Sequence, residues 1–271
     1  MDLNKKTVLL TGASRGLGAA TMTQLLAEGA IVYGASRDPS TVSWPKGVMP
    51  VALDMSSPST LKCSLEASVL STISIDVLIN NAGAGAFASF EATNPDIWDK
   101  QCSLMLRSPI ALCHYVLPKM VSHGTGVIVN VSSLAVEYPI PYMSGYNAAK
   151  SGLSSFSQTL MSELKNKGVS VIDFRPGDFN SSFSDSMEKG EFSEDEEKNG
   201  AKVWKVMEER MAQSPKPEAI AQDLVRAILR GRSGIVRSGS FFQRSLAPLY
   251  SRLVPSSWQR VANERYYKLT D

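Results

Sequence analysis

The sequence predicts an α/β fold in which strands and helices alternate along the chain. Three observations predict it. Apolar runs of strand length recur, helical patterns fill the gaps between them, and the first apolar run leads into a glycine-rich turn. Such alternation is typical of a parallel sheet covered by helices. The expected strands lie near residues 5–11, 30–36, 49–53, 75–80, 126–132, 168–174 and 234–238.

The first expected strand and helix enclose a candidate phosphate site. The apolar run at 8–10 is typical of a strand buried on both faces, and a helical pattern that includes Leu25 follows the glycines. Glycine allows a pyrophosphate to approach closely, and the helix N-terminus offers unpaired N–H groups. The spacing is G-x-x-x-G-x-G rather than the usual G-x-G-x-x-G, so the turn alone also fits a connection without a ligand. The candidate phosphate-binding residues are Gly12, Ser14, Arg15, Gly16, Leu17 and Gly18.

The end of the second expected strand favours NADP(H) over NAD(H). An NAD site usually has an acid here for the ribose 2′-hydroxyl, but this strand ends in Ser36 and Arg37, and Asp38 comes only afterwards, in front of a proline. Arg15 could reach the same region, and two guanidinium groups suit a dianionic 2′-phosphate. The alternative is that both arginines are solvated surface side chains.

The fifth expected strand and the helix after it carry a candidate proton-transfer site. The strand ends at Ser132 and Ser133, while Tyr146 and Lys150 lie four residues apart and so share a helix face. A free tyrosine has a pKa of about 10, and a neighbouring ammonium is expected to lower it. Ser133 could then hold a substrate oxygen while Tyr146 exchanges a proton. A Tyr-x-x-x-Lys pair alone is usually a helix surface, but together with Ser133 and the glycine turn it indicates hydride transfer to or from a nicotinamide.

These motifs resemble the short-chain dehydrogenase/reductase family over roughly residues 5–240. The resemblance implies a doubly wound, Rossmann-type parallel sheet of about seven strands, with helices on both faces, in a single domain at 1–240. It also implies that the catalytic residues are Ser133, Tyr146 and Lys150. The cofactor-binding residues that it adds are Asp54, Met55, Asn81, Ala82, Gly83, Tyr146, Lys150, Pro176, Gly177, Phe179 and Ser181.

One position departs from the family pattern. The family usually has an asparagine in its fourth helix, seven residues after a tryptophan such as Trp98, and this chain has Met105 there. That asparagine helps to hold a water that relays protons to the lysine. The departure fits an enzyme with another proton route. It also fits a cofactor-binding sensor or scaffold protein of the same fold with little turnover.

The stretch at 181–214 is expected to form a lid over the substrate. It combines many charges with apolar side chains at helical spacing, among them Val203 and Met207. Methionines and aromatic residues facing a cleft suit a bulky apolar substrate, such as a steroid-, retinoid- or lipid-like molecule, although packing of a surface helix is the alternative. The candidate substrate-binding residues are Ser133, Tyr138, Met143, Tyr146, Phe183 and Met187.

A basic amphipathic tail is expected at 241–271. Leucines recur there at helical spacing, Pro248 must kink or break the helix, and Pro255 marks a fresh helix start. We expect the tail to dock on the core or on a second subunit of a homodimer or homotetramer. Peripheral contact with a membrane surface is the alternative.

Composition narrows the remaining choices. The chain has 271 residues and is 43% hydrophobic, enough for one globular domain with a sizeable core. A net charge of +2, without a basic run interleaved with aromatics, disfavours nucleic acid and leaves a small molecule as the expected partner. The three cysteines show no metal-ligand spacing, so we expect no metal site and a cytoplasmic protein with reduced thiols.

Overall fold

A computed structural model describes residues 1–180 and 187–270, so Ser181 and Phe183 lie outside the described residues. Seven strands form one fully parallel sheet in the order β3-β2-β1-β4-β6-β7-β9. The order reverses direction beside β1, as in a doubly wound fold, and this confirms the predicted fold class. The strands are β1 (Thr7–Thr11), β2 (Ile31–Ser36), β3 (Val48–Ala52), β4 (Val77–Asn80), β6 (Gly126–Val131), β7 (Val169–Pro176) and β9 (Gly234–Ser238).

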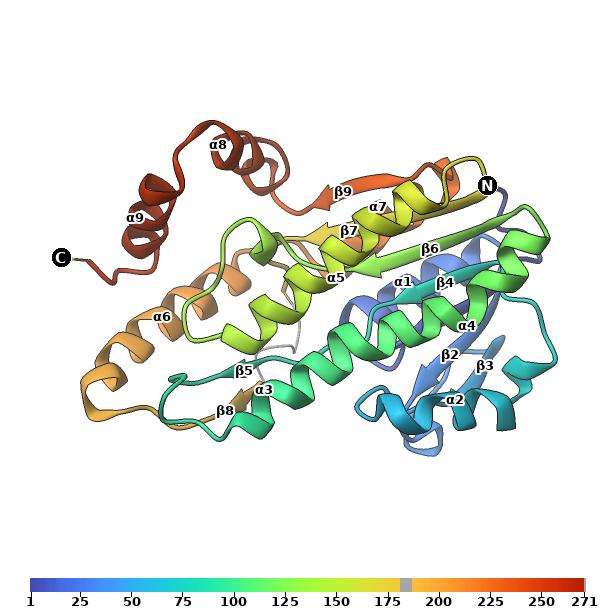
Figure 1. Ribbon diagram of the computed structural model, residues 1–271, viewed down its shortest axis with the longest axis horizontal. Helices are drawn as coiled ribbons and strands as arrows, with labels where there is room; N and C mark the ends of the chain where they lie inside the picture. The colour runs from blue at the N-terminus through green and yellow to red at the C-terminus, as the bar shows by residue number, and fades with distance from the viewer. Residues whose placement is uncertain (181–186, 271) are drawn as a thin grey trace.

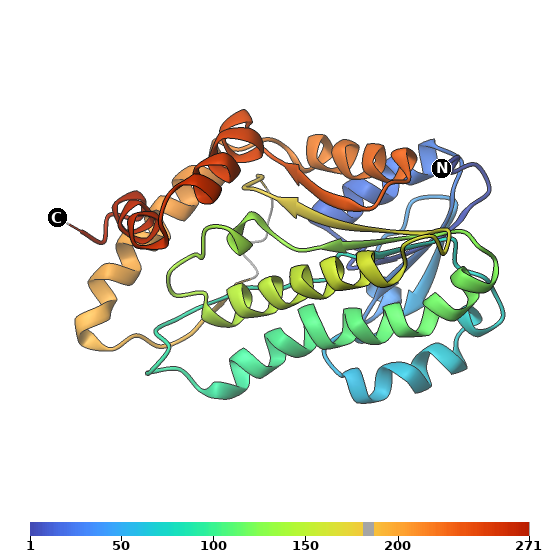
Figure 2. The same cartoon turned by 45° about the horizontal axis from the view of Figure 1, so that its top comes forward.

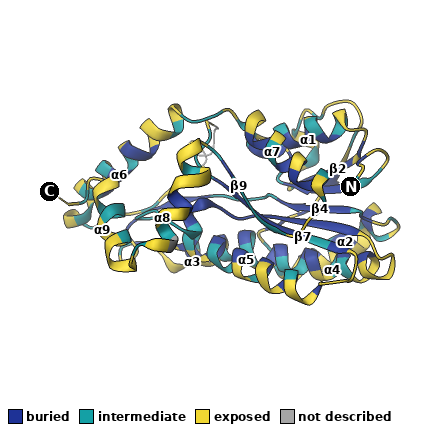
Figure 3. Cartoon of the chain, turned by 90° about the horizontal axis from the view of Figure 1, so that it is seen from above, coloured by how far each residue is buried: buried dark blue, intermediate teal, exposed yellow. Residues whose placement is uncertain are grey.

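Helices cover both faces of the sheet (Figure 3). On one face α1 (Gly16–Ala27) packs against α7 (Pro217–Arg230), and their buried leucines and isoleucines meet the valines of the strands. The other face carries α2 (Pro58–Ala67), α4 (Ser108–Ser122) and α5 (Ser144–Glu163) over a second apolar cluster. The central strands are buried on both faces, which explains their nearly continuous apolar sequences.

A π-helical turn and a short pair of strands lie outside the regular alternation of strands and helices. The helix α3 (Pro95–Cys102) runs into α4 through a π-helical turn at Ser103–Arg107, and π-helical turns often occur at functional sites. The strands β5 (Ala86–Phe87) and β8 (Glu188–Lys189) pair in parallel apart from the main sheet. Two residues are too few to show a strand pattern, so the sequence did not predict this pair.

The remaining helices gather beyond the carboxyl ends of the strands (Figures 1 and 2). They are α6 (Glu194–Ala212), a π-helical turn at Phe242–Leu246, α8 (Ala247–Leu253) and α9 (Ser256–Tyr266). Pro248 lies in the first turn of α8, directly after the π-helical turn, so the expected irregularity in the helix falls just before it. Within the described residues, no helix combines the length and the hydropathy needed to cross a bilayer.

Candidate active site

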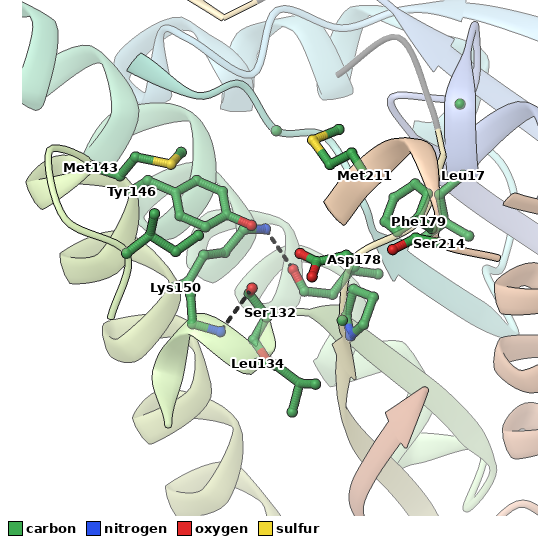
Figure 4. A pocket seen from close by; sticks show the side chains of 18 of the residues that line it. Leu17, Ser132, Leu134, Met143, Tyr146, Lys150, Asp178, Phe179, Met211 and Ser214 are labelled. Atoms are coloured by element: carbon green, nitrogen blue, oxygen red, sulfur yellow. Dashed lines mark hydrogen bonds between the residues drawn. The ribbon is translucent and has the colours of Figure 1, made fainter. Parts of the chain in front are cut away.

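The carboxyl end of β6 and the first turns of α5 bring the candidate proton-transfer residues together. Figure 4 shows Tyr146 and Lys150 in one pocket, and the Lys150 ammonium nitrogen lies 5.8 Å from the centre of the tyrosine ring. The Ser133 hydroxyl hydrogen-bonds the phenol and also accepts a bond from the backbone N–H of Ala135 at 3.0 Å. Lys150 donates to the backbone carbonyl of Val131 at 2.6 Å, which anchors its ammonium to the strand end.

Burial dominates the electrostatics of this group. It raises the pKa of Tyr146, although the hydrogen bond from Ser133 lowers that pKa and the charge of Asp178 raises it further. The sequence led us to expect that Lys150 and the nicotinamide cation together lower this pKa, whereas in the protein alone burial makes the net shift upward. Burial also lowers the pKa of Lys150 to about 8, against the opposing effect of Asp173. The phenol therefore needs a further positive charge beside it before it ionises near neutral pH.

The glycine turn after β1 is packed too tightly for side chains. Gly12 has a φ of +63°, and a Cβ there would lie 2.8 Å from the Cα of Ala82. A Cβ on Gly18 would lie 2.0 Å from the carbonyl oxygen of Gly12. Asn81 holds the turn from the end of β4, because its side-chain amide donates to the carbonyl oxygens of Thr11 at 3.0 Å and Gly12 at 3.1 Å.

The turn fits the pyrophosphate of a nicotinamide dinucleotide. The α1 helix begins after Arg15, which occupies the N-cap without a capping side-chain hydrogen bond, so the first backbone N–H groups can donate hydrogen bonds to an anion. The residues from Ser14 to Gly18 line the same cavity as Tyr146 and Lys150. The chain therefore provides a phosphate cradle and a proton-transfer group within one space.

The ends of β2 and β3 form the opposite end of this cavity. Ser36, Arg37 and Asp54 line it, and Asp38 does not appear among its described lining residues. Asp38 instead accepts bonds from the backbone N–H of Ser40 at 3.0 Å and from its hydroxyl at 2.6 Å. Hydrogen bonds from Ser56 lower the pKa of Asp54, and the charge of Arg37 lowers it further.

A single large cavity connects the predicted residues. Its volume is about 1630 Å³, and every predicted cofactor- or substrate-binding residue that the structure describes lies along it. Three walls at the tyrosine end are apolar: the segment before α5, the α6 helix and the tail. Their lining residues include Tyr138, Ile140, Met143, Met207, Met211, Phe242, Leu246, Leu249 and Tyr250, and Met187, just before β8, adds to the same apolar lining.

The side chains of Met105 and Lys150 both approach Gly83. The side chain of Met105 is 1% exposed, and its sulfur lies 3.4 Å from the point that a Cβ on Gly83 would occupy. The ammonium nitrogen of Lys150 lies 3.8 Å from that same point. The π-helical turn at Ser103–Arg107 thus directs an apolar side chain toward the place where the family usually has a polar one.

The sequence did not single out two polar groups of the site. Asp178 and Gln243 line the cavity, and the amide of Gln243 donates to Asp178 at 2.7 Å. Asp178 directly follows Pro176-Gly177, so its position along the chain was an available signal. Gln243 lies 65 residues further along the chain, and no local pattern connects it to Asp178.

A buried ion network beneath the site was also missed. Arg175 donates to Asp173 at 2.9 Å and to Glu137 at 2.5 Å, and Arg237 also donates to Glu137, at 2.6 Å. Asp173 further accepts bonds from the hydroxyls of Ser132 and Ser154. The network joins β7 and β9 to α5 and to the segment after β6, which together carry the proton-transfer residues.

Comparison with known proteins shows the family. A family model described as short chain dehydrogenase matches residues 6–191. The 3-ketodihydrosphingosine reductase of Bacteroides thetaiotaomicron is 29% identical over 231 residues, which cover 84% of this chain and 85% of that protein. The crystal structure of a short-chain dehydrogenase from Streptomyces avermitilis has a TM-score of 0.76 and 25% identity, covering 97% of this chain and 99% of that one. The chain belongs to the short-chain dehydrogenase family, whose members are oxidoreductases.

Proteins that share the fold bind either nicotinamide dinucleotide. A short-chain dehydrogenase from Burkholderia cenocepacia was solved with NADP (TM-score 0.69, 23% identity, 94% of this chain and 100% of that one). One from Burkholderia phymatum was solved with NAD (TM-score 0.75, 18% identity, 93% of this chain and 94% of that one). The choice between the two cofactors therefore depends on the residues of this chain.

Proposed function

We propose that this protein is an NADP(H)-dependent oxidoreductase that interconverts a carbonyl and an alcohol on a bulky apolar substrate. The observation that carries the proposal is the continuous cavity of about 1630 Å³ from Arg37 to the tail. Pockets for one drug-sized ligand measure about 300–1,000 Å³. The larger volume suits a dinucleotide together with a substrate, and the apolar walls at the tyrosine end suit a steroid-, retinoid- or lipid-like molecule.

The residues around Tyr146 would carry out the proton transfer. Ser133 and Tyr146 would hold the substrate oxygen, and the phenol would give it a proton in reduction or take one in oxidation. Lys150 would contribute positive charge and a hydrogen bond to the nicotinamide ribose. The cofactor, when bound, supplies the hydride chemistry and, in its oxidised form, a positive charge close to the phenol.

Two features support NADP(H) as the cofactor. Arg15 and Arg37 are both exposed and line the cavity at the end of β2, where a 2′-phosphate would accept charge-assisted hydrogen bonds. Asp38 accepts two hydrogen bonds from Ser40 on its Oδ1 and is not one of the described residues that line the cavity, so no carboxylate at the end of β2 competes with a 2′-phosphate there.

Fluorescence titration of the full chain with NADPH and NADH tests the cofactor preference. We expect NADPH to bind more tightly, and Arg37→Ala to weaken NADPH binding about 10–100-fold, the equivalent of a lost charge-assisted hydrogen bond, with little effect on NADH. Arg232→Ala is the matched control, because this exposed arginine lies near the amino end of β9. Equal affinities for the two cofactors in the unmodified protein would overturn the preference.

A further inference from the structure

Asp178 places a carboxylate at the substrate end of an otherwise mostly apolar cavity. Among the described lining residues the acids are Asp54, at the adenosine end, and Asp178. Figure 4 shows the Asp178 side chain directed into the pocket, close to Tyr146. The two groups interact electrostatically, since the charge of Asp178 raises the pKa of Tyr146.

The tail holds this carboxylate in place. Gln243 donates to its Oδ2 at 2.7 Å, and the other amide atom of Gln243 accepts from the backbone N–H of Ser240 at 3.3 Å. Glycines make room for that amide, because a Cβ on Gly177 or Gly239 would lie 2.6 Å or 2.9 Å from its oxygen. The side-chain amide of Gln243 therefore orients the carboxylate of Asp178.

Asp178 forms no ion pair with any residue that the structure describes, and its Oδ1 accepts no hydrogen bond from these residues. Burial raises the pKa of Asp178, while the hydrogen bond from Gln243 and the charge of Arg210 lower it; the Arg210 guanidinium lies over the ring of Tyr266, 5.0 Å from the ring centre. A carboxylate in such surroundings pays for desolvation without a paired charge, and a cationic ligand group would supply that charge.

We propose, on the basis of the function proposed above, that the substrate is an amino ketone or the matching amino alcohol, and that Asp178 binds its ammonium group. The carbonyl oxygen would lie at Tyr146 and Ser133, with the apolar part of the substrate between α6 and the tail. In reduction the carbonyl carbon gains a hydride from NADPH and its oxygen gains the proton of Tyr146, while the ammonium is unchanged.

The proposal explains why a negative charge lies beside the catalytic phenol. Unpaired, the Asp178 carboxylate opposes ionisation of Tyr146 and makes the phenol a poorer acid. A bound ammonium would offset that effect, so a cationic substrate would improve proton transfer as well as binding. A neutral ketone would leave the carboxylate uncompensated.

Three probes of equal chain length test this: a long-chain 2-amino-3-ketone, the corresponding 2-hydroxy ketone, and the unsubstituted ketone. NADPH oxidation by the full chain is measured at a pH where the amine is protonated. We expect the amino ketone to have the highest kcat/KM. In Asp178→Asn, which keeps the shape and the bond from Gln243, the ratio of amino to unsubstituted ketone should fall about 10–100-fold. Glu209→Gln, which removes an equal charge from an exposed position on α6, should leave the ratio unchanged.

Calorimetry separates the proposed oxidoreductase activity from the proposed ammonium site. It measures how a long-chain amino alcohol and the matching unsubstituted alcohol bind to the complex of the protein with NADP. Amine binding that depends on Asp178, without turnover of any ketone, would support the ammonium site and overturn the proposed activity. Equal kcat/KM for the amino and unsubstituted ketones, or equal loss of all three in Asp178→Asn, would overturn the ammonium site while the activity stands.

Discussion

The ammonium of Lys150 is buried at the end of β6, where it donates a hydrogen bond to the Val131 carbonyl and the carboxylate of Asp173 acts on it from β7. The four-residue spacing of Tyr146 and Lys150 correctly predicted a shared helix face. It could not predict the direction of their pKa shifts, because depth of burial depends on the strands and the tail that surround the helix. Residue type and spacing therefore indicated proton transfer by Tyr146 and Lys150, whereas the packing around the helix determines their pKa values.

The lowered pKa of Lys150 predicts how stability varies with pH. Between the folded value of about 8 and the unfolded value of 10.5, the unfolded chain binds more protons at this group. Its contribution to the free energy of unfolding should then rise with pH, by up to about 1.4 kcal/mol per pH unit. Denaturant titrations across this window should show that rise relative to Lys150→Met. For Lys62→Met, at an exposed site, the plot of unfolding free energy against pH should run parallel to that of the unmodified protein. If the plot for Lys150→Met also ran parallel to it, the lowered pKa of Lys150 would be contradicted.

Met105 tests whether a missing polar group limits the proton supply. Met105→Asn places an amide in the buried surroundings of Gly83, which Lys150 also approaches, and an unpaired buried amide costs about 1–3 kcal/mol. We expect the variant to fold with a lower melting temperature and to have a higher kcat or a shifted pH–rate profile. A folded variant with an unchanged profile would show that Met105 does not limit turnover. The sensor or scaffold alternative would then lose its support.

The elements were largely predictable because period and length identify them. All seven expected strands are present, with boundaries that differ by at most two residues from those predicted. The π-helical turns escaped prediction because one extra residue in a turn leaves the apolar pattern nearly intact. The ion network around Arg175 could not be predicted, because its side chains come together only when β7 and β9 pair, with Arg175 directly opposite Arg237.

Removing Arg175 should destabilise the frame that carries the site. Arg175→Met leaves Asp173 and Glu137, which are 0% and 8% exposed, without their shared cation. Loss of one partner from a buried pair costs about 3–5 kcal/mol, and denaturant unfolding measures it. Arg226→Met removes an arginine that is 60% exposed from its pair with Asp223, and should cost less than about 1 kcal/mol. Similar losses in both variants would contradict a structural role for the network.

At the scale of the whole molecule, the tail completes the cavity that the parallel sheet begins. Gln243 reaches Asp178, and Asn263 donates to the carbonyl of Pro139 at 2.7 Å. These contacts join segments far apart in the sequence, so only the folded chain reveals them. The tail also exposes the large apolar side chains of Leu253 and Trp258, which are 73% and 71% exposed. Burial of that side in a homodimer or homotetramer remains a prediction, to be checked by light scattering.

The central claim is that Tyr146 transfers the proton while the rest of the site binds the cofactor. Tyr146→Phe removes the hydroxyl and keeps the ring, so NADPH should bind with nearly unchanged affinity while carbonyl reduction is lost. The measurement is NADPH oxidation by the unmodified protein and the variant, beside a fluorescence titration of each with NADPH. The account predicts intact binding with turnover reduced at least about 100-fold, the lower end of what a general acid contributes. A Tyr146→Phe variant that reduces carbonyls at the rate of the unmodified protein would contradict it.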